Sequence, residues 1–67
     1  MDRDWGAYVR GRRAVLQMSQ YDLADRLAER TNRSRNVWVV AVRLVEDGVL
    51  LPSHEIAAKL GNVLGGA

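Results

Sequence analysis

Apolar residues recur along most of this chain at the three- and four-residue spacing that places them on one face of a helix. The spacing predicts four helices, over residues 4–17, 19–30, 37–47 and 53–64, with short polar connections between them. Four helices indicate an all-α fold in a single small domain. The expected inward residues are Trp5, Tyr8 or Val9, Leu16, Leu23, Ala24, Leu27, Ala28, Trp38, Ala41, Val42, Val45, Ile56, Leu60, Val63 and Leu64.

Short polar residues stand where three of these helices should begin. Asp4, Ser19 and Ser53 are the expected N-caps, because their side chains accept hydrogen bonds from the first free backbone N–H groups. For the third helix Asn36 is the preferred N-cap and Ser34 the second choice. That helix should end at Gly48, a typical C-terminal residue, shortly before Pro52.

Residues 37–46 are open to two interpretations. Their valines favour a strand, yet a lone strand would have no obvious partner in this sequence. Helical spacing also survives, with Trp38 on an inner face and Val39, Val40, Arg43 and Asp47 on an outer one. We therefore expect a helix. Arg13 falls on or beside the apolar stripe of the first helix, where it would need a carboxylate partner.

Composition narrows the class of protein. The chain has 67 residues, no cysteine and one histidine, so disulfides and a thiolate zinc site are excluded, and we expect no cofactor or metal. No apolar run approaches the ~20 residues of a membrane helix, and residues 1–5 do not resemble a signal peptide, so we expect a cytoplasmic protein. Neither Ser19 nor Ser53 has a nearby base that would make it a nucleophile, which argues against an enzyme.

The net charge of +2 is weak evidence for a nucleic-acid partner, but the basic residues are clustered. Most are arginines, whose planar fork suits phosphates and guanine edges. One cluster lies in the first helix and another, without an acidic residue, lies in the 31–36 connection and just before it. Each cluster has a plain alternative as a solvated face.

The order of several short motifs resembles the XRE, Cro and lambda-repressor-like helix-turn-helix family. The residues that carry the resemblance are Arg13, Ser19-Gln20, Leu23-Ala24, Leu27, Glu46-Asp47-Gly48, Pro52-Ser53, Glu55, Leu60 and Leu64. It covers most of the chain, but the part between Ala28 and Trp38 is about eight residues longer than usual in that family. Many members of the family add a fifth helix that helps them to dimerise; because the sequence ends at Ala67, we expect none here.

The resemblance implies a four-helix fold in which the second and third helices form a helix-turn-helix and the third enters the DNA major groove. It implies a structural ion pair between Arg13 and Glu46. It also implies a small transcriptional repressor that occupies an operator, with tight binding requiring a homodimer on a palindromic site. The candidate DNA-binding residues are Gln20, Tyr21, Arg33, Ser34, Arg35, Asn36, Val39, Val40 and Arg43.

Within this set the expected roles differ. Arg43 would read a guanine through two hydrogen bonds, and Val39 and Val40 would contact thymine methyl groups. The residues of the connection would meet phosphates. The competing hypothesis is a protein-interaction module, or an antitoxin, in which Val37, Val39, Val40 and Leu44 dock a protein partner. Trp38 and Trp5 are expected to lie in the core, and His54 at the surface.

Overall fold

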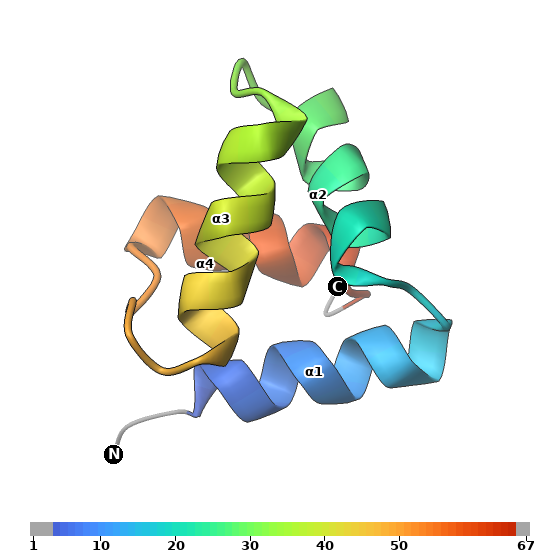
Figure 1. Ribbon diagram of the computed structural model, residues 1–67, viewed down its shortest axis with the longest axis vertical. Coiled ribbons are helices and arrows are strands. Elements are labelled where there is room, and N and C mark those ends of the chain that lie inside the picture. The colour runs from blue at the N-terminus through green and yellow to red at the C-terminus, as the bar shows by residue number, and fades with distance from the viewer. Residues whose placement is uncertain (1–3, 66–67) are drawn as a thin grey trace.

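The computed structural model describes residues 4–65, which form four α-helices and contain no strand. They are α1 (Trp5–Leu16), α2 (Gln20–Glu29), α3 (Arg35–Glu46) and α4 (His54–Val63) (Figure 1). The all-α prediction is thus confirmed, and the ambiguous valine-rich segment is a helix. None of the helices is long and apolar enough to cross a membrane, within the same residues.

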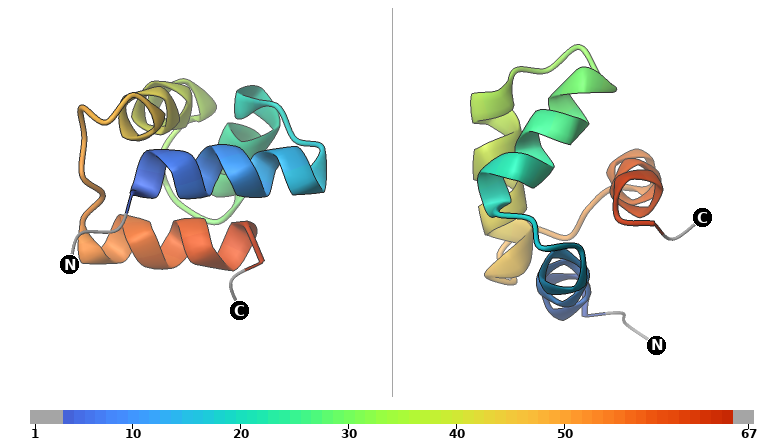
Figure 2. Two further views of the ribbon diagram at one scale, coloured as in Figure 1. Left: turned by 90° about the horizontal axis from the view of Figure 1, so that it is seen from below. Right: turned by 90° about the vertical axis from the view of Figure 1, so that its right-hand side faces the viewer.

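The helices pack as two crossed pairs. α2 and α3 lie side by side, and their contact is the most extensive in the molecule (Figure 1). α1 and α4 run in nearly the same direction as each other, across that pair (Figure 2). The end of α3 rests on α1, and α4 packs against α2. The arrangement leaves the outer side of the α2–α3 pair uncovered.

Side-chain caps define the helix starts. Asp4 accepts a hydrogen bond from Ala7 N at 3.0 Å, and Ser53 accepts one from Ile56 N at 3.2 Å. Ser19 and Asp22 form a reciprocal capping box, with distances of 2.9 and 3.0 Å. These three predicted caps are confirmed. The backbone bond that Ser19 N–H donates to Asp22 is also the largest cause of the lowered pKa of that carboxyl.

The prediction that Asn36 caps α3 is wrong. Ser34 is the N-cap, and its hydroxyl accepts a hydrogen bond from Val37 N at 3.3 Å. α3 therefore begins two residues before the predicted start. At its other end Gly48 has a φ of +77°, and the N–H groups of Gly48 and Val49 donate to the carbonyls of Val45 and Leu44. That paired closure is the Schellman motif, which favours glycine at this position.

One threonine organises the connection between α2 and α3. Thr31 donates its hydroxyl hydrogen to Leu27 O at 2.9 Å, and the hydroxyl oxygen accepts from Trp38 Nε1 at 2.8 Å and from Arg33 N at 3.3 Å. The connection is residues 30–34, shorter than the predicted 31–36. Thr31 gives the buried indole the polar partner it needs, so Trp38 is a core residue, as expected.

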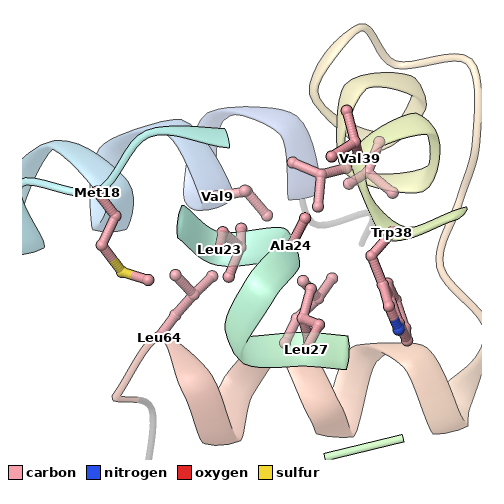
Figure 3. Packing of buried hydrophobic residues seen from close by; sticks show 11 residues of the cluster. Val9, Met18, Leu23, Ala24, Leu27, Trp38, Val39 and Leu64 are labelled. Atoms are coloured by element: carbon pink, nitrogen blue, oxygen red, sulfur yellow. The ribbon is translucent and has the colours of Figure 1, made fainter. Parts of the chain in front are cut away.

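The core lies where all four helices meet, and it corrects the sequence interpretation in two places (Figure 3). Val39 is only 9% exposed, so its assignment to the outer face is wrong. It lies three residues before Val42 and seven before Glu46, and together they widen the buried arc of α3. Leu16 is exposed, because the chain reverses at Gln17, and Met18 is buried in its place.

Candidate nucleic-acid interface

A buried ion pair lies beneath the uncovered side of the α2–α3 pair. Arg13 on α1 donates from Nε to Glu46 Oε2 at 2.7 Å and from Nη2 to Glu46 Oε1 at 2.9 Å. Arg13 Nη1 also donates to the carbonyl of Met18 at 3.0 Å, and Arg10 donates to the backbone carbonyl of Glu46. The pairing of Arg13 with Glu46 is confirmed. It ties the end of α3 to α1 in a fixed orientation.

The environment keeps Glu46 ionised. Burial alone would raise the pKa of this carboxyl, since Glu46 is only 6% exposed. The hydrogen bonds from Arg13 and Gln20 and the positive charges of Arg13 and Arg10 outweigh burial, and the pKa of Glu46 lies below its ordinary value. The hydrogen bond to Glu46 likewise raises the pKa of Arg13. Both groups are therefore charged at neutral pH.

Gln20 connects this ion pair to the surface. Its Nε2 donates to Glu46 Oε1 at 3.1 Å, while its Oε1 accepts from Arg43 Nε at 3.2 Å. Arg43 also donates from Nη2 to the hydroxyl oxygen of Tyr21 at 3.1 Å. Two residues in the first turn of α2 thus accept hydrogen bonds from Arg43, in the second half of α3.

Tyr21 lies between two arginines. The guanidinium carbons of Arg35 and Arg43 stand 5.1 and 5.8 Å from the centre of its ring, within the range of a cation–π contact. Arg35 is further held by Asp25, whose Oδ1 lies 2.7 Å from Arg35 Nε. We call Gln20, Tyr21, Arg35 and Arg43 the arginine–tyrosine cluster. It presents two positive charges on the uncovered side of the molecule.

Four of the nine predicted site residues are therefore brought together by the fold, whereas Arg33 lines a different groove, with Trp38 and Ile56. Val40 is 57% exposed, and Asn36 and Arg33 are exposed in α3 and in the preceding connection. Ser34 uses its hydroxyl as the α3 cap. Val39, being buried, is not available to a partner. Its proposed contact with a thymine methyl is thus corrected by the structure.

Asp25 is a member of this site that the sequence interpretation missed. It follows Tyr21 by four residues on α2, so the two share a helix face, and this spacing was a readable signal. The pairing of Asp25 with Arg35 could not be read from the sequence, because this contact depends on how α3 lies against α2. The described residues hold no group of three or more histidine, cysteine or acidic side chains arranged to bind a metal ion.

The exposed charged groups of this site are the guanidiniums of Arg35 and Arg43 and the carboxylate of Asp25, which pairs with Arg35. We compared the chain with models of known protein families, with curated proteins and with solved structures, and none of them matches.

Proposed function

We propose that this protein binds double-stranded DNA sequence-specifically, through a helix-turn-helix formed by α2 and α3, as a small repressor of the XRE, Cro and lambda-repressor-like type. One observation carries the proposal. Two exposed arginines of α3 converge on Tyr21 of α2. Behind them the ion pair of Arg13 with Glu46 ties α3 to α1, and Gln20 of α2 donates a hydrogen bond to the same carboxylate. Arginines held in place on one helix face suit phosphates and the edges of guanines.

The dimensions of α3 agree with this role. Its 12 residues rise about 18 Å, enough to cross a major groove that is ~12 Å wide. Its exposed residues include Arg35 and Arg43 of the cluster, and Asn36 and Val40. In our proposal Arg43 reads a guanine, Val40 contacts a thymine methyl, and Arg33 and Arg35 meet phosphates.

Repression would follow from occupation of an operator. A single domain of this size makes few contacts, so we expect two copies on a palindromic site with half-sites ~34 Å apart. The protein measures 31 × 23 × 22 Å, so two copies fit next to each other at that spacing.

The test is selection of binding sites from a random duplex DNA pool, followed by the same selection with Arg43→Ala. We expect an enriched palindromic motif that loses one guanine in each half-site in the variant. Arg26→Ala is the matched control, because Arg26 is an exposed α2 arginine that lines a different groove, with Leu16 and Met18. If no motif is enriched with the unaltered protein, the proposal is refuted.

A second candidate is a protein-interaction surface, alone or within an antitoxin. Its support is the exposure of Val37, Val40 and Leu44 on α3. Salt separates the two: DNA binding weakens steeply as salt rises, whereas docking of an apolar face does so only slightly.

A further inference from the structure

We propose that Gln20 is a positioning residue, which acts on DNA through Arg43 by fixing the direction of its guanidinium. This inference rests on the proposed DNA binding and adds to it a determinant of base specificity. It differs from the expectation that Gln20 itself contacts DNA, because both ends of its side-chain amide already have partners within the protein.

The orientation of the amide follows from its neighbours. Its NH₂ group faces the Glu46 carboxylate and its oxygen faces the Arg43 guanidinium. A flipped amide would place oxygen against carboxylate and NH₂ against guanidinium, and both contacts are repulsive. Only one orientation is therefore stable. Because Arg13 holds the same carboxylate with two further bonds, that orientation is set from the core.

This anchoring selects one edge of Arg43 for a partner. Gln20 and Tyr21 occupy the N–H groups of the edge formed by Nε and Nη2. The guanidinium is a rigid planar fork, so the end edge, formed by Nη1 and the second hydrogen of Nη2, is left to donate elsewhere. A pair of parallel donors on that edge fits O6 and N7 of guanine. Adenine presents a donor in place of O6, so a fixed Arg43 would reject it.

A mobile arginine would not discriminate in this way. An unanchored side chain could turn to a phosphate when the guanine is replaced, and so recover much of the lost energy. Fixing Arg43 before binding removes that escape and lowers the cost of ordering it on DNA. The expected consequence is that loss of Gln20 weakens discrimination at one base pair more than it weakens binding in general.

The first test compares Gln20→Met with Gln17→Met, a control in which an exposed glutamine outside the cluster is changed. The base pair read by Arg43 is identified with Arg43→Ala. At that base pair we expect the unaltered protein and the control to prefer guanine over adenine by about tenfold to a hundredfold. Gln20→Met should reduce the preference to a few-fold, and leave preferences at other positions and the salt slope unchanged.

A double-variant comparison decides between the two roles of Gln20. If Gln20 acts through Arg43, Gln20→Met has no further effect on discrimination in an Arg43→Ala background. If the two effects add, or if Gln20→Met removes a preference at another base pair, Gln20 contacts DNA itself and the inference is overturned. Thermal unfolding of each variant shows that its fold is retained.

A second test needs no DNA and separates this inference from the proposed function. The mobility of the Arg43 Nε–H group is measured by ¹⁵N relaxation in the free protein. We expect a rigid group in the unaltered protein and in Gln17→Met, and a mobile one in Gln20→Met. Equal mobility in all three overturns the positioning role, even if the protein selects a DNA motif. If the Arg43 Nε–H group is rigid in the unaltered protein and mobile in Gln20→Met, but the protein selects no DNA motif, only the DNA-binding proposal is refuted.

Discussion

Two glycines in α1 allow the close contact behind the site to be tested with one kind of substitution. Gly6 is buried against the last turn of α3, and a β-carbon there would lie 2.7 Å from the carbonyl oxygen of Glu46 and 3.0 Å from that of Val45. Gly11, on the same helix, has nothing within 4 Å of such a carbon. Both are replaced by alanine, which favours a helix over glycine by about 1 kcal/mol.

The two variants should change stability in opposite directions. At position 11 only the helix preference acts, so Gly11→Ala should raise the free energy of unfolding by about 1 kcal/mol. At position 6 the new methyl group overlaps backbone atoms that cannot rotate away, so α1 and α3 must separate by several tenths of an ångström. Overpacking of this kind costs about 1–3 kcal/mol. Separation also weakens the bonds that Arg10 and Arg13 make to Glu46, at about 1 kcal/mol.

We therefore expect Gly6→Ala to lower the free energy of unfolding by about 1–3 kcal/mol after its helix gain is included. Urea and thermal unfolding, followed by far-UV circular dichroism, measure the difference. Each kcal/mol corresponds to about 4–8 °C in a domain of this size. If Gly6→Ala is as stable as Gly11→Ala, α1 and α3 do not approach as closely as described, and the reasoning is wrong.

Three further predictions follow from the same contacts. Thr31→Val removes the partner of Trp38 Nε1 and should cost about 1–3 kcal/mol in urea unfolding, whereas Asn32→Ala in the same connection should cost little. Because the pKa of Glu46 is lowered on folding, the stability this carboxylate adds is present above its ordinary pKa of about 4.5 and is lost as the pH falls through the folded value. Glu46→Gln should therefore cost about 2 kcal/mol at pH 7, with a flatter pH dependence in acid. Asp22→Asn is the comparison variant, because folding also lowers the pKa of the Asp22 carboxyl. The change that it makes in the pH dependence of stability is the part that does not come from Glu46. Asp25→Asn should hardly change stability, since the pair is exposed, but it frees Arg35, so affinity for DNA of any sequence should rise several-fold and more than with Glu29→Gln. An equal rise with both variants would mean that only net charge matters.

The parts of the fold that were predicted correctly are those set by neighbouring residues. Caps act over three residues, so Asp4, Ser19 and Ser53 could be read from the chain directly. The inner face of α2 follows from its spacing, because that helix is buried along a single stripe. Val39 could not be placed in this way. Its burial depends on α3 packing against both α1 and α2, and the spacing of one helix does not contain that information.

The candidate site shows the same division. Residue types and their exposure pointed to Tyr21, Arg35 and Arg43, but not to the bonds between them. Those bonds depend on where the start of α2 crosses the end of α3, which is a property of the packed pair. The pairing of Asp25 with Arg35 and the two-sided role of Gln20 were missed for that reason. Of the links to this site, only that between Arg13 and Glu46 was predicted, and that prediction came from the resemblance rather than from spacing.

The segment between Ala28 and Trp38 shows that a sequence pattern can predict the helices without predicting which side chains form the surface between them. Only residues 30–34 form a connection, and the first turn of α3 takes up most of the remainder. That turn carries Arg35, which lies eight residues, or about 12 Å of helix, before Arg43. Both side chains nevertheless converge on the ring of Tyr21. The segment thus supplies Arg35, the second cation of the cluster, from a residue that the sequence interpretation placed in the connection and not in a helix.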